Sequence, residues 1–292
     1  MEFHVLNRKT VTVAFVCFLF AGFFSCEERI KIDTAASAPR LVIYGYITTD
    51  TLRHAIRITR SSDYFSTGKP EGISGAIVGI RHKDETYPLT ESASEPGLYQ
   101  TDDNVAGQVG ETYTLHISLD FDGDGQLEEY EAESVLPPVS RLDSMAVQPS
   151  LLSDHLLEIS IWGRLPDQEE NYISVHLYCN DRLVNDSLQG FSLADDLFLK
   201  KKEIEGLSVL YLNQERESSK LTPGDLLTCQ IEGITREYAD FISNAQSEHR
   251  GSLPLFSSPP ANIETNVHSL SGGGVSGFFT AFSISRISMI YR

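Results

Sequence analysis

The sequence predicts a mainly β protein with one short helix. Apolar residues alternate with polar ones in several short segments, such as Tyr113 to Leu119. This period of two is typical of half-buried antiparallel strands. Turn-forming glycine and proline residues separate the segments at short intervals, as they do in sandwiches. We therefore expect an immunoglobulin- or transthyretin-like antiparallel sandwich over residues 40–138. A second β-rich domain, sandwich or barrel-like, is expected over residues 139–292.

The first region divides into six or seven short strands. An apolar run at 41–47 is followed by strands near 55–58 and 76–80, and by short segments around Tyr87 and Tyr99. The alternating segment at 113–119 and a returning strand at 130–136 complete the set. Pro137 and Pro138 then end the region, because neither proline can donate a hydrogen bond to a strand ladder.

The second region contains a hairpin and at least two more strands. Residues 157–161 and 173–179 alternate, with a polar, proline-bearing loop between them. Apolar segments at 207–212 and 226–231 predict further strands, whereas residues 181–206 have no clear period. Residues 278–291 are interpreted as a strand, a turn near Ser285 and a second strand.

One helix is predicted, near residues 235–247. Thr235 is a suitable N-cap, because its hydroxyl can accept a hydrogen bond from the first turn. Tyr238, Phe241, Ile242 and Ala245 follow it at helical spacing.

The N-terminus has the pattern of an export signal. Arg8 and Lys9 precede an apolar run over residues 11–24, which is too short to span a membrane as a helix. Ser25 precedes Cys26, and this junction resembles a bacterial lipoprotein signal, in which the cysteine is lipidated before cleavage. We expect a signal peptide over residues 1–25, lipid on Cys26 and a polar tether over residues 26–39. An ordinary signal peptide with an incidental cysteine is the alternative.

Charge and cysteine content narrow the class of protein. The chain has a formal net charge of −18, which argues against nucleic acid as a partner because nucleic-acid binding requires a basic surface. Beyond Cys26 the exported chain keeps Cys179 and Cys229. Export permits a disulfide between them, but both lie in apolar, strand-like segments where buried free cysteines are common. Two buried thiols are slightly favoured.

An acidic loop matches a calcium-binding pattern. Residues 120–131 fit D-x-[DN]-x-[DN]-G-x₅-E at every specified position. The ligands would be carboxylates of Asp120, Asp122, Asp124 and Glu131 and the carbonyl of Gln126. Strands are expected on both sides of this loop, so it is not a helix–loop–helix hand. The alternative is a solvated hairpin connection, because Asp-Gly pairs form turns by themselves.

The sequence contains no constellation typical of an enzyme. The histidines are scattered, and His116 and His176 occupy the polar phase of alternating strands, where surface positions are expected. No G-x-S-x-G motif is present. Trp162, Tyr172 and Tyr178 lie in or near the 157–179 hairpin and would form a ligand platform if exposed, although packing in the core is the commoner role.

Several ordered motifs resemble a known family. They include the 41–47 run, Gly110-Glu111-Thr112-Tyr113 and Thr235-Arg236-Glu237-Tyr238. Pro260-Ala261-Asn262-Ile263 and Gly273-Gly274-Val275-Ser276-Gly277-Phe278 follow in the same order. This set is similar to the Bacteroidota lipoprotein family called domain of unknown function 4249.

The resemblance implies a cell-envelope lipoprotein, often encoded beside TonB-dependent outer-membrane transporters, with no assigned activity. Glu27 and Glu28 after the cysteine are similar to signals for the cell surface. We therefore expect a non-enzymatic lipoprotein of the outer membrane, anchored by lipid, that assists such a transporter in nutrient uptake. A surface adhesion or structural module is the alternative, and a cryptic hydrolase is a third reading.

Overall fold

The computed structural model confirms a mainly β fold with one α-helix in the described residues. It describes residues 40–61, 70–168, 170–195, 202–249 and 263–292. The predicted signal peptide, Cys26, the tether and residues 260–262 of the family motifs lie outside these ranges. No helix in the described ranges combines the length and apolar character needed to span a membrane.

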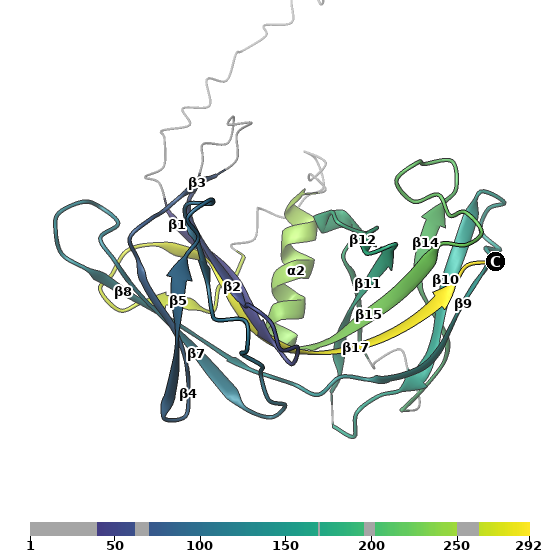
Figure 1. Cartoon of the computed structure of the whole chain (residues 1–292), viewed down its shortest axis with the longest axis horizontal. Helices are drawn as coiled ribbons and strands as arrows, with labels where there is room; N and C mark the ends of the chain where they lie inside the picture. Colours follow the sequence, from purple (N-terminus) through teal and green to yellow (C-terminus); the bar gives the residue numbers. More distant parts are fainter. Residues whose placement is uncertain (1–39, 62–69, 169, 196–201, 250–262) are drawn as a thin grey trace, which may run out of the picture. The chain divides into compact units, whose positions relative to one another are not determined.

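Most strands belong to one large sheet (Figure 1). Its order is β12-β11-β15-β17-β1-β2-β6-β5-β4-β7-β8-β16, with β13 beside β11 and β3 beside β2, so the described path does not close on itself. The bounds are β1 (Leu41–Thr48), β2 (Ala55–Arg60), β3 (Glu71–Gly72), β4 (Ile77–His82), β5 (Glu85–Glu91), β6 (Leu98–Gln100), β7 (Thr112–Leu119), β8 (Glu128–Val135), β11 (Tyr172–Cys179), β12 (Arg182–Leu183), β13 (Ser192–Asp195), β15 (Leu226–Ile234), β16 (Val267–Ser269) and β17 (Val275–Ile290).

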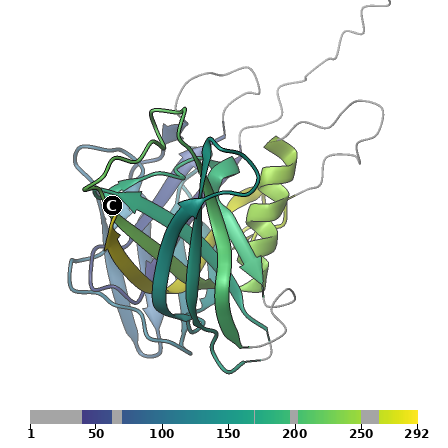
Figure 2. The ribbon, with the colours of Figure 1, turned by 90° about the vertical axis from the view of Figure 1, so that its right-hand side faces the viewer.

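A smaller sheet of three strands lies over one end of the large sheet. It consists of β9 (Arg141–Pro149), β10 (Leu156–Arg164) and β14 (Glu203–Asn213), with β10 in the centre. Figure 2 shows these teal and green strands in front of the large sheet. Buried residues from β10, β14, β11 and β15 form one hydrophobic core between the two sheets. A separate core is formed mainly by residues of β1–β8.

Strand β17 is longer than expected and changes partner along its length. Residues 275–282 pair in parallel with β1, and residues 283–290 pair antiparallel with β15. The turn predicted near Ser285 is therefore wrong. Serine at 283, 285 and 288 gave the appearance of a turn, but Ser285 lies opposite Ile231 in the ladder and the Ser283 hydroxyl donates to the Pro137 carbonyl. The division of the chain at Pro138 stays a prediction.

The helix forms where its N-cap predicts. Helix α2 (Arg236–His249) follows Thr235, whose Oγ1 accepts a hydrogen bond from the Tyr238 backbone N–H at 3.2 Å. One side of α2 buries Tyr238 and Ile242 against Phe278 and Phe282 of β17. The helix also contacts β11 and the short 3₁₀ helix η1 (Leu188–Gly190). It thus covers the face of the sheet opposite to the three-stranded sheet.

Alternation in the strands assigns each side chain to one of these two faces. In β11, Ile173, Val175 and Leu177 belong to the core under the smaller sheet. Successive side chains of a strand point to opposite faces, so Ser174 and His176 lie on the face that α2 covers. His176 is only 8% exposed, and the surface position predicted for it is wrong. The polar phase of this strand is covered by a helix and a loop.

Candidate functional site

An aromatic pocket lies on the helix-covered face of the large sheet. Its volume is about 380 Å³, and its walls come from β1, β11, β15, β17, α2 and the segment around Phe191. The aromatic side chains that line it are Tyr44, Tyr46, Tyr178, Phe191, Tyr238 and Phe282. Strand alternation directs Tyr44 and Tyr46 to this pocket, because they lie on one face of β1 while Ile43 and Ile47 enter the core on the other face.

The rings pack against one another as well as against the pocket. Tyr46 and Phe282 have ring centroids 5.5 Å apart, and the hydroxyls of Tyr44 and Tyr238 are hydrogen-bonded at 2.6 Å. Tyr238 and Phe282 are buried, whereas Tyr44 is 37% exposed and Tyr46, Tyr178 and Phe191 are half-buried. The pocket therefore has a firmly packed base and aromatic faces that remain accessible.

A buried carboxylate stands at the centre of the polar part of the pocket. Glu232 of β15 is 6% exposed and accepts hydrogen bonds from Ser174 Oγ at 2.6 Å and from Gln230 Nε2 at 2.8 Å. His176 Nε2 lies 3.3 Å from the same carboxylate. Ser174 is the direct cross-strand partner of Glu232 in the β11–β15 ladder, so the register of two neighbouring strands builds this contact.

The network continues to the edge of the pocket through Arg286. Arg286 Nε donates to Gln230 Oε1 at 2.7 Å, and its two terminal nitrogens donate to the carboxylate of Asp50 at 3.1 and 2.5 Å. The side-chain hydrogen bonds to Asp50 raise the pKa of Arg286 above its ordinary value. Strands β11, β15 and β17 and the loop after β1 thus contribute to one chain of hydrogen bonds.

Burial raises the pKa values of the pocket tyrosines. It is the largest cause for Tyr44, Tyr46, Tyr178 and Tyr238, and the negative charge of Glu232 acts in the same direction on all four. These phenols therefore stay protonated at neutral pH, and the walls of the pocket are neutral rings around a negative centre.

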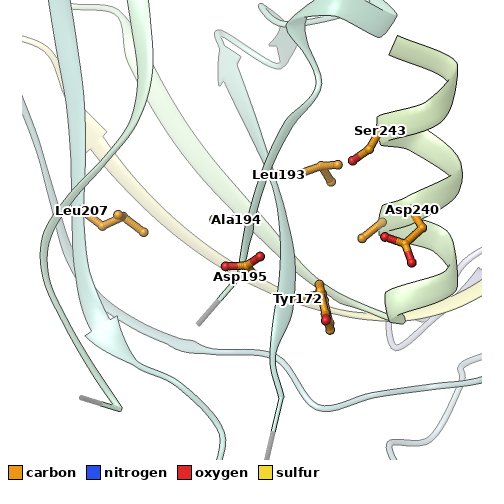
Figure 3. Close-up of a pocket in the computed structure, with 8 residues that line it drawn as sticks. Tyr172, Leu193, Ala194, Asp195, Leu207, Asp240 and Ser243 are labelled. Carbon is orange, nitrogen blue, oxygen red and sulfur yellow. The ribbon is translucent and has the colours of Figure 1, made fainter. Parts of the chain in front are cut away.

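The three aromatic residues predicted to form a platform are not together. Tyr178 lines the aromatic pocket, whereas Tyr172 lines a second pocket of about 340 Å³ between β13 and α2 (Figure 3). Trp162 lies in β10 of the smaller sheet, and its ring is close to Gly206. A Cβ atom added at Gly206 would be only 3.1 Å from that ring. Sequence reasoning missed the other rings because they lie far apart in the chain.

The second pocket is lined by strand and helix residues. Figure 3 shows Tyr172, Leu193 and Asp195 on one side and Asp240 and Ser243 of α2 on the other. Asp240 lies 3.8 Å from Arg236, one helical turn away. This arrangement supplies fewer buried polar groups than the aromatic pocket, which we take as the candidate site.

Both cysteines in the described ranges are free. Cys229 is buried, and burial raises its pKa to about 12. Cys229 lies opposite Leu177 in the ladder, which makes Cys179 its diagonal neighbour. Diagonal pairs are about 7–8 Å apart at Cα, beyond the usual separation for a disulfide.

The acidic loop brings together three of its predicted calcium ligands. Carboxylate oxygens of Asp120, Asp122 and Asp124 lie within 4.8 Å of one another, and all three residues are exposed. The Asp120 carboxylate accepts hydrogen bonds from the backbone N–H groups of Gly123 and Gly125. The Gln126 backbone N–H donates to Asp124.

Glu131 is not part of this cluster. Strand β8 begins at Glu128, so Glu131 lies within the ladder opposite His116, whose Nδ1 is 3.3 Å from its carboxylate. Glu128 lies closer to the loop, and its carboxylate accepts a hydrogen bond from the Phe121 N–H. The strand therefore begins too early for Glu131 to chelate as the sequence pattern requires.

Calcium binding to this loop stays a proposal with a direct thermal test. Calcium at 100 times its dissociation constant would stabilise the folded state by about 2.7 kcal/mol and raise the melting temperature. Asp122→Ala should lower the melting temperature only in the presence of calcium, because Asp122 is exposed and otherwise bonds only within the loop. Differential scanning calorimetry with calcium or with chelator measures both effects. If the parent protein melts at the same temperature in both, the loop binds no calcium.

Comparison with known proteins places the chain in a family. No curated protein matches it. A solved structure named "putative carbohydrate binding protein", from Bacteroides uniformis ATCC 8492, is 14% identical and covers 66% of this chain and 89% of its own, with a TM-score of 0.21. A family model described as "Domain of unknown function (DUF4249)" matches residues 27–288. Because this match spans nearly the whole chain after the predicted signal peptide, the protein belongs to the DUF4249 family.

Proposed function

We propose that this protein is a non-enzymatic, lipid-anchored binding protein of the outer membrane. It holds a small ligand in the aromatic pocket and assists a TonB-dependent transporter in taking that ligand up. The observation that carries the binding role is the pocket itself, in which accessible aromatic faces surround a buried hydrogen-bonded carboxylate. Such concave, mostly apolar pockets with a few fixed polar groups are typical of ligand sites.

The polar groups of the pocket favour binding over catalysis. The Ser174 hydroxyl donates to Glu232, and His176 Nε2 contacts the same carboxylate. In serine triads the nucleophile's hydroxyl is hydrogen-bonded to an imidazole that a carboxylate orients, whereas here the Ser174 hydroxyl donates directly to the Glu232 carboxylate. Because Ser174 Oγ and His176 Nε2 are both directed to Glu232, the two side chains do not form the serine–histidine pair of such a triad.

The location rests on the N-terminal sequence and the family. Cys26 follows an export signal, and acidic residues follow Cys26. Lipid on this residue would fix the protein to the membrane without a spanning segment.

Cell fractionation and purification test this proposal. The parent protein should be found in the membrane fraction, whereas Cys26→Ser should lose membrane attachment because the serine carries no lipid. A tagged parent protein, purified from native membranes in mild detergent, should carry a TonB-dependent transporter with it. Cys179→Ser is the matched control and should remain with the membrane. Recovery of the lipoprotein without a transporter would count against the uptake role.

A further inference from the structure

We infer that the ligand of the aromatic pocket is an organic ammonium cation, a positively charged nitrogen carrying alkyl groups. This assignment rests on the proposed binding role of the pocket and names its ligand class. The carrying observation is that one buried carboxylate, Glu232, lines the same pocket as the aromatic faces. Neither feature alone would select a charge, but together they favour a cation that is itself partly apolar.

The aromatic walls supply the first part of the argument. Tyr46, Tyr178 and Phe191 are half-buried, so parts of their rings remain accessible from the pocket. The face of an aromatic ring carries negative charge density and attracts a cation lying over it. Alkyl groups on the cation would contact the same rings and leave water, which adds a hydrophobic contribution. Cages of this kind are the usual recognition device for quaternary ammonium groups.

The charge of Glu232 supplies the second part. The negative charge of Glu232 raises the pKa of four pocket tyrosines, because it disfavours their phenolate forms. Burial raises the same pKa values more strongly. At Tyr178 the positive charge of Arg286 acts in the opposite direction on the pKa, but less strongly than Glu232. The negative charge of Glu232 therefore favours a cation in the space beside these tyrosines. An anionic ligand would meet the same field as repulsion.

The other charged groups of the pocket do not cancel Glu232. Arg286 is paired with Asp50 through two hydrogen bonds, so these two charges offset each other. His176 Nδ1 is buried and has no hydrogen-bond partner in the described ranges. Its other ring nitrogen, Nε2, lies 3.3 Å from the Glu232 carboxylate. Within the described residues no arginine or lysine forms an ion pair with Glu232, and the chain as a whole carries a net charge of −18.

The hydrogen-bond network argues against a purely polar ligand. Gln230 donates to Glu232 and accepts from Arg286, and Ser174 donates to Glu232. The hydroxyls of Tyr44 and Tyr238 bond to each other. With these groups bonded within the protein, a ligand recognised mainly through its hydroxyls would have to break existing bonds. A cation attracted to the ring faces and to the negative charge of Glu232 would not have to break these hydrogen bonds.

A pair of probes with the same shape and different charge tests the inference. Choline carries a quaternary nitrogen, and 3,3-dimethyl-1-butanol has a carbon atom in its place. We expect the mature protein, in uncharged detergent, to bind choline at least tenfold more tightly in isothermal titration calorimetry, because only choline carries the positive charge that the ring faces and Glu232 attract. A tenfold difference corresponds to about 1.4 kcal/mol. Equal affinities for the two probes, or no saturable binding of choline, would overturn the assignment.

Two variants place the bound probe in this pocket. Glu232→Gln should reduce the affinity ratio of the two probes, leaving only the preference that the ring faces supply, whereas Glu205→Gln should leave the ratio unchanged. Glu205 is an exposed strand glutamate of β14 that does not line the pocket. Tyr178→Leu should weaken choline several-fold and avoids altering the buried network. If Tyr178→Leu leaves the affinity for choline unchanged, the probe binds elsewhere and the inference fails.

A third measurement distinguishes a lipid headgroup from a free solute as the source of the cation. Vesicles of phosphatidylcholine present the same headgroup on a lipid, and vesicles of phosphatidylglycerol lack it. When choline binds, additional pocket-dependent binding to the phosphatidylcholine vesicles, but not to the phosphatidylglycerol vesicles, would assign the cation to a lipid headgroup. Binding of choline without binding of either vesicle would assign it to a solute, and either result supports the inference. Co-purification of the transporter does not depend on the probe, so failure of the cation assignment would leave the uptake role standing.

Discussion

Replacing Gly277 with alanine is expected to lower the free energy of unfolding by at least about 4 kcal/mol, an exceptional loss for a single methyl group. Gly277 has a φ of +109°, and an added Cβ would lie 1.8 Å from the carbonyl oxygen of Ile43. Ile43 is its neighbour in the parallel β1–β17 ladder. The obstacle is backbone, so the overlap can be relieved only by separating the two strands. Urea unfolding followed by circular dichroism measures the loss.

Gly272 provides the matched control for this prediction. Its φ is +93°, so alanine is strained there as well, but an added Cβ has nothing within 4 Å. Gly272→Ala should therefore cost only the backbone strain, about 1–2 kcal/mol. If both variants lost the same stability, the close approach of β1 to β17 would not explain why glycine stands at 277.

Replacing Glu232 with alanine is expected to cost about 3 kcal/mol, because it leaves several buried donors without an acceptor. Ser174 and Gln230, which are 0% and 5% exposed, both donate to this carboxylate. His176 Nε2 loses the same partner. Each unsatisfied buried donor costs about 1–3 kcal/mol before the pocket relaxes or admits water. Urea unfolding measures the difference between the parent and variant proteins.

An exposed glutamate separates this effect from a general change in charge. Glu205→Ala removes the same charge from the exposed side of β14 and should alter stability by no more than about 0.5 kcal/mol. A double variant that adds Ser174→Ala to Glu232→Ala should recover part of the lost free energy of unfolding, because it removes one of the buried donors left without an acceptor. A Glu232→Ala protein as stable as the parent would mean that the carboxylate is dispensable to the fold.

Local patterns predicted the strands and failed on how distant strands meet. Alternation at 113–119 and 173–179 identified strands and the core-facing residues within them. The parallel pairing of β1 with β17 left no local signal, because the partners lie at opposite ends of the chain. The serines of β17 predict a turn, because serine is common in turns. The sequence does not distinguish such a serine from one that pairs with a neighbouring strand.

The candidate site was only partly predictable for the same reason. Tyr178 was singled out, but the rings around it come from β1, α2 and β17, and no spacing links them. The alternation around His176 predicts a surface position because polar phases usually face water, and no local pattern indicates that α2 covers it. A glutamate between Ile231 and Gly233 in an apolar run was the available signal for Glu232. Three aspartates of the calcium pattern lie close together, whereas Glu131 lies within strand β8, and calcium binding stays a prediction.

The pairing of β1 with β17 has a consequence for the order in which the chain folds. Leu41 is among the earliest described residues to leave the ribosome, and its ladder partner Val275 is among the last. Until the final strand has emerged, β1 lacks a neighbour on that side, and Phe279 and Ala281 are missing from the first core. Joining such distant segments closes a long loop and slows folding. We therefore expect a chain that still lacks β17 to remain incompletely folded, with part of its first core open to water.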